Sequence, residues 1–170
     1  MSLEMCFWQV SDGRISSFRH IGVARFSQGA GVTNHKNVVL FHFLLNGTKK
    51  GASGPLRIFE TWFRPYRCAD LLIDDSVFGM DAFGMDGADT QALLERLKAL
   101  SNTEIRARAR SYAEKRARRE RLWSWLRIPR RPIVAAVDDD YAYLEDCFAN
   151  LREICELAVA SKCGLIWAPG

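Results

Sequence analysis

One segment of this chain carries too much charge to be buried. Residues 106–131 contain ten arginines and one lysine but only two glutamates, which gives the segment a formal charge of +9. The remaining 144 residues hold 13 basic and 18 acidic groups, a balance of −5. Because arginine is almost never fully buried without a partner, the segment must lie at the surface of a mildly acidic body.

Local signals predict that this basic segment is helical. Ser101 and Glu104 have the spacing of a capping box, which marks a helix start, and the helix could continue to about Arg127. Pro129 and Pro132 follow, and proline ends helices. At 1.5 Å per residue such a helix would span about 39 Å.

The apolar face of this helix is incomplete. Ile105, Ala109 and Tyr112 begin a stripe at helical spacing, but Arg116 and Arg119 stand where its next turns should be apolar. A helix packs on a core through a continuous apolar stripe. We therefore expect the middle of the helix to project into solvent.

Composition limits the class of protein. With 170 residues, 48% hydrophobic and 26% charged, the chain fits one folded domain over residues 1–170. Its longest uncharged run, residues 37–48, is shorter than the ~20 residues of a membrane span. The first ten residues lack a signal-peptide pattern, and the five cysteines show no C-x-x-C spacing. We expect a cytoplasmic protein without cofactor or metal.

Strand patterns dominate the first half of the sequence. Residues 5–10 and 15–26 flank the turn signal Ser11-Asp12-Gly13, as in a hairpin. Residues 38–45 are apolar on both faces except at His42, which suggests a central strand with a buried histidine. Residues 56–63 and 66–73 suggest two more strands. The expectation is an N-terminal antiparallel sheet of about five strands within residues 1–85.

Helical patterns dominate the second half, residues 89–163. Residues 90–100 have leucines at helical spacing, and Asp86 or Asp89 could cap that helix. Residues 141–161 carry a regular apolar stripe, with Gly164 at the expected C-terminal cap. Residues 165–167 could return to the sheet as a terminal edge. Strands followed by three helices, one long and Arg-rich, indicate an α+β fold.

The basic helix is the strongest candidate site. Arginine forks match phosphates and carboxylates, so the segment could bind a partner protein or track a nucleic-acid backbone. Its arginines could instead pair with the protein's own acids, notably the six aspartates within residues 68–94, and its Trp-bearing end could lie on an anionic membrane surface. The candidate residues are Arg106, Arg110, Lys115, Arg116, Arg118, Arg119, Arg121, Arg127, Arg130 and Arg131.

Catalytic and metal-binding patterns are sparse. The aspartates at 70, 74, 75, 81, 86 and 89 could offer oxygen ligands, but their spacing differs from a calcium loop. Loop solvation and helix capping explain them better. Cys6 or Cys68 beside His20 or His35 could form a nucleophile pair, although nothing in the sequence fixes that geometry. We expect a protein without catalytic residues.

Part of the chain resembles a known family. Residues 62–100 carry Trp62, Pro65 and Cys68, and then Gly87, Asp89, Gln91, Ala92 and Leu93. These residues are similar to a family of small uncharacterised bacterial α+β domains whose helix opens with Gly-x-Asp-x-x-Gln-Ala-Leu. Here one residue separates Asp89 from Gln91, where the family has two. The resemblance implies a fold and no chemistry.

Together these features favour an interaction protein. We expect a non-enzymatic bacterial protein that binds a protein partner, or a second copy of itself, through its charge-segregated surface. An immunity-type or toxin-neutralising role is one form of this function. The alternative is a nucleic-acid-binding protein that places residues 104–131 on phosphates.

Overall fold

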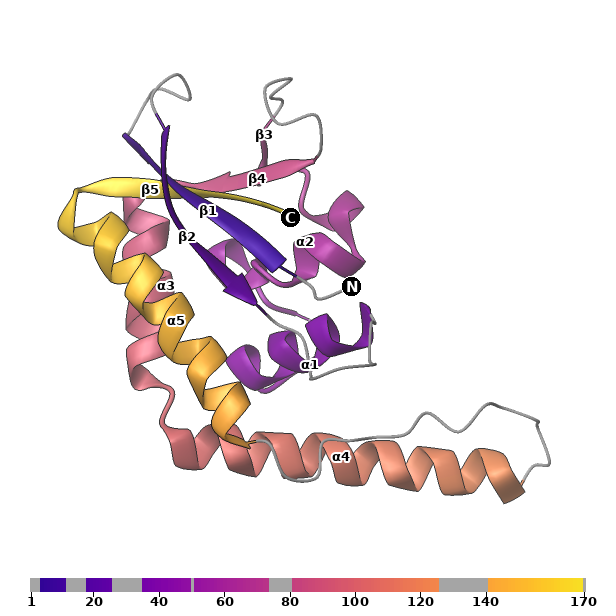
Figure 1. Cartoon of the computed structure of the whole chain (residues 1–170). Coiled ribbons are helices and arrows are strands. Elements are labelled where there is room, and N and C mark those ends of the chain that lie inside the picture. Colours follow the sequence, from indigo (N-terminus) through magenta and orange to yellow (C-terminus); the bar gives the residue numbers. More distant parts are fainter. Residues whose placement is uncertain are drawn as a thin grey trace.

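The computed structural model describes residues 4–11, 18–25, 35–49, 51–73, 81–125 and 141–169. Strands occur at both ends of the chain and helices between them (Figure 1). The elements in chain order are β1 (Glu4–Ser11), β2 (Phe18–Arg25), α1 (His35–Asn46), η1 (Gly54–Arg57), α2 (Glu60–Phe63), η2 (Pro65–Arg67), β3 (Leu72–Ile73), β4 (Ala82–Met85), α3 (Gly87–Ala99), α4 (Asn102–Trp125), α5 (Tyr141–Ala160) and β5 (Cys163–Pro169).

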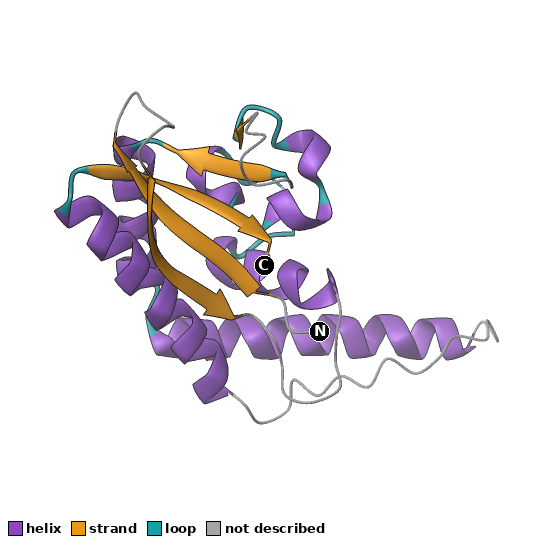
Figure 2. Cartoon of the chain, turned by 45° about the horizontal axis from the view of Figure 1, so that its top comes forward, coloured by secondary structure: helices purple, strands orange, loops and turns teal. Residues whose placement is uncertain are grey.

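The strands form one five-stranded sheet in the order β2-β1-β5-β4-β3, with every neighbouring pair antiparallel. The α+β class and the β1–β2 hairpin are thereby confirmed. The helices pack against one face of the sheet (Figure 2). The sheet is not purely N-terminal, because β5 comes from the C-terminal end of the chain, outside the predicted range 1–85.

The prediction of a terminal edge at residues 165–167 is wrong, since β5 lies at the centre of the sheet. Leu165 and Trp167 are buried against the helices, and Ile166 and Ala168 are buried on the opposite face. A strand that is apolar on both faces is stable only where both faces are covered. Its sequence therefore suits the centre better than the edge.

The strand predicted at residues 38–45 is also wrong, because this run forms α1. Periodicity does not separate a short buried strand from a buried helix. In α1, apolar side chains on several sides of the helix are buried, among them Val38, Leu40 and Phe43. His42 is buried as expected, but in a helix. Gly47, with a φ of 72°, takes the left-handed conformation just after α1.

The two strands predicted at residues 56–63 and 66–73 are replaced by short helical turns, and only Leu72–Ile73 pairs with the sheet. Pro55 and Pro65 each stand at the first positions of a 3-10 turn. Proline is preorganised for such starts and has no N–H for a strand ladder. The β4 strand, which the pattern analysis did not predict, supplies the pairing for β3.

The C-terminal helices follow their predicted bounds within a few residues. Asp86 caps α3 by accepting a hydrogen bond of 2.8 Å from the Asp89 amide, and Ser101 Oγ accepts one of 3.2 Å from the Glu104 amide at the start of α4. The expected cap at Gly164 is wrong. Lys162 takes the left-handed conformation, with a φ of 55°, and Gly164 belongs to β5.

The main core lies between the sheet and the helices. Phe7 and Trp167 from the sheet meet the stripe of α5, which includes Leu144, Phe148 and Leu151. The indole N–H of Trp167 donates to Thr61 Oγ1 at 3.2 Å, which satisfies both buried polar groups. No described helix combines the length and the hydrophobicity needed to cross a membrane.

Candidate interaction surface

The long helix α4 has two unlike halves. In the first half, Ile105, Ala109 and Tyr112 are buried, and this half packs against α1 and α5. The outer part of α4 extends away from the rest of the described fold (Figure 1). The basic helix predicted from the cap at Ser101 to about Arg127 is thus present as α4, and its outer part projects as its interrupted apolar stripe indicates.

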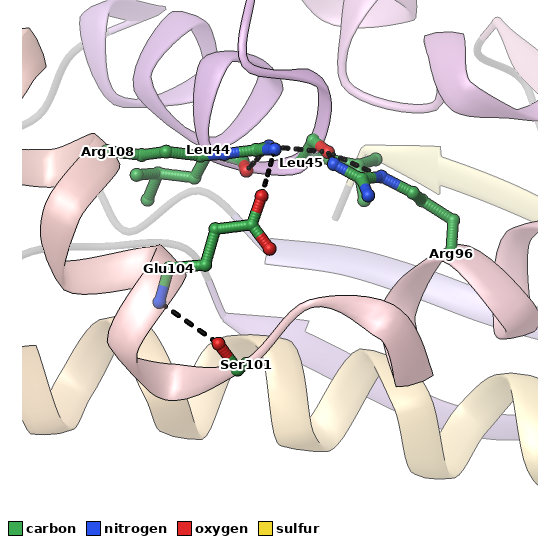
Figure 3. A network of polar contacts seen from close by, with 6 residues as sticks. All are labelled: Leu44, Leu45, Arg96, Ser101, Glu104 and Arg108. Atoms are coloured by element: carbon green, nitrogen blue, oxygen red, sulfur yellow. Dashed lines mark hydrogen bonds and ion pairs between the residues drawn. The ribbon is translucent and has the colours of Figure 1, made fainter.

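Two arginines fix the first half of α4 and the end of α3 to the C-terminus of α1. Arg108 Nη1 donates to the carbonyl oxygens of Leu44 and Leu45 at 2.6 and 3.0 Å, and Arg108 Nη2 forms an ion pair with Glu104. Arg96 donates to the Leu45 oxygen at 2.8 and 3.0 Å (Figure 3). The last carbonyls of a helix lack partners within it and attract positive charge. Both arginines are therefore structural.

Arg106 and Arg110, two of the predicted site residues, face the start of α5. Arg106 Nε and Nη2 donate to the Glu145 carboxylate at 2.5 and 3.2 Å, and these hydrogen bonds lower the pKa of Glu145. The Arg110 guanidinium lies 5.8 Å from the centre of the Tyr141 ring. Arg106 and Arg108 pair with glutamates, and not with the aspartates that the sequence suggested.

The outer half of α4 forms what we call the basic arm, residues 114–121. Lys115, Arg118, Arg119 and Arg121 are exposed and Arg116 is partly buried. With Glu114 and Glu120 the arm has a formal charge of +3. Successive residues are about 100° apart around a helix, so the cations surround the arm. Lys115 and Arg119 stand four positions apart, where like charges destabilise a helix by about 0.2–0.5 kcal/mol.

A further cation, Lys49, meets the arm where it leaves the body. We call Lys49, Lys115, Arg116 and Arg119 the basic notch. Lys49 Nζ lies 4.5 Å from the centre of the Tyr112 ring, and Lys115 Nζ lies 5.4 Å from that of Phe43. The two rings are themselves 5.4 Å apart. Two ammonium groups thus rest on one aromatic pair.

Electrostatics marks the notch as a concentration of positive charge. The pKa of Lys49 is lowered, first by partial burial and then by the charges of Arg119, Lys115 and Arg116. The sequence analysis missed Lys49, because more than 60 residues separate it from the arm. The interrupted stripe at Arg116 and Arg119 was the available signal, since those positions continue the face that packs on α1.

Several predicted residues lie outside the described ranges. Arg127, Arg130 and Arg131 are among them, as are Pro129 and Pro132 beyond the predicted end of the helix. The Trp-bearing end of the helix, which could contact a membrane surface, has side chains outside the described set. The part of the site that the structure places therefore consists of the arm, the notch, Arg106 and Arg110.

The aspartate-rich stretch forms no described metal site. Asp86 caps α3, and Asp70 accepts from Arg57 Nη1 at 3.0 Å. Asp74 and Asp75 lie outside the described ranges. Among the residues that the structure describes, no group of three potential ligands could hold a metal ion. Capping and ion pairing account for the two aspartates with recorded contacts.

The cysteine–histidine pairs considered from sequence find no support in the described ranges. Cys68 is buried, and burial raises the pKa of its thiol, as it does for Cys6. A raised pKa disfavours the thiolate that a nucleophile requires. His20 packs against the Trp8 ring, with centroids 5.8 Å apart. The side chain of His35 lies outside the described set.

Comparisons with family models, curated proteins and solved structures gave no match for this chain. The resemblance of residues 62–100 to a bacterial α+β family stays a prediction. Any functional inference must therefore rest on the site itself.

Proposed function

We propose that this chain is an interaction protein that binds an acidic protein partner through the basic arm and the basic notch. The observation that carries the proposal is the change in α4 after Tyr112, where a helix anchored in the core continues as an exposed cationic arm. Arg118 and Arg119 have no recorded ion pair with any described residue.

The arm contributes little to the fold that produces it. Most helical stability in proteins comes from packing an apolar face, and every described side chain of the arm except Arg116 is exposed. Its like charges oppose one another at helical spacing. An acidic partner would relieve that repulsion, and the exposed charges would speed the encounter.

The charge of the body favours a protein partner over nucleic acid. Outside residues 106–131 the chain has a balance of −5. A folded partner can present an acidic patch to the arm and a neutral or basic surface to the body. Nucleic acid is negative along its whole length, so a strand that continued past the arm and the notch would meet the rest of the chain, whose net charge is negative.

The proposal is tested by capturing the partner from extracts of the source cells with the purified protein. The test variant reverses Arg116, Arg118, Arg119 and Arg121 to Glu. The control reverses the exposed Arg19 and Arg67, which belong to β2 and η2. The same protein bands should be recovered by the wild type and the control and lost by the arm variant. Unchanged recovery by the arm variant would refute the proposal.

A salt titration separates the nucleic-acid alternative. If about five phosphates were contacted, the logarithm of the binding constant for a duplex DNA or an RNA would fall with log salt at a slope near −4.5. We expect weak nucleic-acid binding at ~50 mM salt that is undetectable at ~200 mM. Tight binding at ~50 mM salt that weakens by a factor of hundreds at ~200 mM, as this slope requires, would support the alternative.

A further inference from the structure

We propose that the basic notch is a site for a phosphoryl group carried by an acidic segment of the partner protein. This inference rests on the proposed function, and it names the chemical group that anchors the partner at the root of the arm. It concerns Lys49, Lys115 and Arg119, with Arg116 beside them.

The notch brings together cations from two separate elements. Lys49 follows the end of α1, whereas the other three residues belong to α4. Packing of Phe43 against Tyr112 fixes the two elements together, with ring centres 5.4 Å apart. The ammonium groups of Lys49 and Lys115 each rest on one of these rings. Their positions are thus set by the core, and not by the extended arm alone.

Three cations of the notch form no ion pair within the part of the chain that the structure describes. Within the described ranges, no carboxylate is recorded as an ion-pair partner of Lys49, Lys115 or Arg119, although other exposed cations such as Lys98 and Arg106 have one. The repulsion between like charges rises as the distance between them falls. An external anion would offset this repulsion.

The amount of charge selects the anion. A carboxylate brings one negative charge, whereas a phosphorylated serine or threonine brings about −1.5 to −2 and three acceptor oxygens. Three or four cations whose charges act on one another match a dianion better than a single carboxylate. Arg119 can donate two parallel N–H groups to phosphate oxygens, and the lysines supply point charges. Clusters of this kind are a recurrent way to recognise phosphorylated, acidic segments.

The test uses the peptide Ala-Glu-Glu-Ser-Glu-Glu-Ala with and without phosphate on its serine, and a third version with Glu in place of the serine. Affinities are measured by calorimetry at about 0.1 M salt. The wild type should bind the phosphopeptide at least about tenfold more tightly than either other peptide, as expected for charge-assisted hydrogen bonds. Equal binding of the three peptides would overturn the inference.

Matched variants locate the site. Lys49→Gln combined with Lys115→Gln should weaken phosphopeptide binding about tenfold, while Arg118→Gln with Arg121→Gln, which removes equal charge outside the notch, should weaken it about threefold or less. Equal losses in both variants would assign the effect to general electrostatics and refute the notch. As a second signature, ³¹P NMR should show the second phosphate pKa, about 6 in the free peptide, lowered on binding to wild type but not to the notch variant.

Two further experiments distinguish failure of the phosphoryl site from failure of the proposed function. A 5′-phosphorylated single-stranded RNA that binds more tightly than the phosphopeptide, and depends on Lys49, would overturn the inference in favour of nucleic acid. If the notch variant still captures the partner from extracts and the arm variant does not, the phosphoryl site fails and the proposed function stands. If both variants still capture the partner, both the phosphoryl site and the proposed function are refuted.

Discussion

Arg108 of α4 and Leu44 of α1 are joined across 64 positions of sequence by a hydrogen bond of 2.6 Å, from the guanidinium Nη1 to the backbone carbonyl oxygen. This contact shows that the arginines of one helix have different roles. Arg108 completes the C-terminus of a buried helix, whereas Arg118, three turns later, is exposed. A basic segment that looks uniform in sequence is thus divided into an anchor and an arm.

The anchoring role predicts a clear loss of stability. Arg108→Gln should lower the free energy of unfolding by about 1.5–3 kcal/mol, because it removes hydrogen bonds from a charged donor to buried carbonyl oxygens. Arg118→Gln should change it by less than about 0.5 kcal/mol, as is usual for exposed sites. Urea denaturation of the two variants measures the difference. Similar losses in both would contradict the division of α4.

Charge reversal in the arm should separate stability from binding. Arg119→Glu replaces a like-charge pair with an attractive one between Lys115 and position 119, which favours the helix by a few tenths of a kcal/mol. The thermal midpoint should therefore stay the same or rise slightly, while partner capture from extracts falls sharply. Circular dichroism and the capture assay test the two parts. A large drop in the midpoint would show that the arm supports the fold.

Gly164 should tolerate no side chain. A Cβ at this position in β5 would lie 2.3 Å from the carbonyl oxygen of Met85 and 3.0 Å from the Cα of Asp86, both backbone atoms that cannot turn away. Gly164→Ala should cost about 1–3 kcal/mol or more. Gly22→Ala is the control, because its Cβ would meet only the Ile154 side chain, at 3.3 Å. Chemical denaturation should show the smaller loss for Gly22→Ala.

The burial of His42 should make the free energy of unfolding depend on pH. His42 is fully buried, and its Nε2 has no hydrogen-bond partner among the described residues. Burial lowers the pKa of His42 below 6.5, against an opposing effect of Glu60 and together with the charge of Arg64. Just below pH 6.5, His42 therefore becomes protonated in the unfolded chain while it stays neutral in the folded chain. Stability should fall as the pH drops below 6.5 and level off below the folded-state pKa.

The check on His42 compares denaturation at pH 7.5 and pH 5.5. In wild type the midpoint should be lower at the acidic pH. In His42→Gln, which does not titrate in this range, the part of the change that comes from this residue disappears. An identical pH dependence in the two proteins would show that His42 does not control it.

Local signals made much of the fold predictable. The capping box at Ser101 and Glu104, the antiparallel pairing of β1 with β2, and the regular stripe of α5 each depend on residues close in sequence. The apolar run of α1 misled because burial on all sides removes the periodicity that separates helix from strand. The turns around Pro55 and Pro65 were missed because apolar residues between the prolines resemble strands.

The candidate site was predictable only in part. The exposed arm followed from arginines at positions where the stripe of Ile105 and Tyr112 should continue. Lys49 was not predictable, because only the packing of α1 on α4 brings it to the arm. The same packing gives Arg108 a structural role that its sequence neighbours do not reveal.

Site-specific photo-crosslinking in cell extracts tests whether the basic arm contacts a partner protein. A photoreactive phenylalanine derivative is placed at position 118 on the arm or, as a control, at the exposed position 153 on α5. We expect an adduct from position 118 that protease removes and nuclease does not, and that disappears when Arg119 and Arg121 are reversed to Glu. A nuclease-sensitive adduct, or equal adducts from both positions, would contradict this expectation.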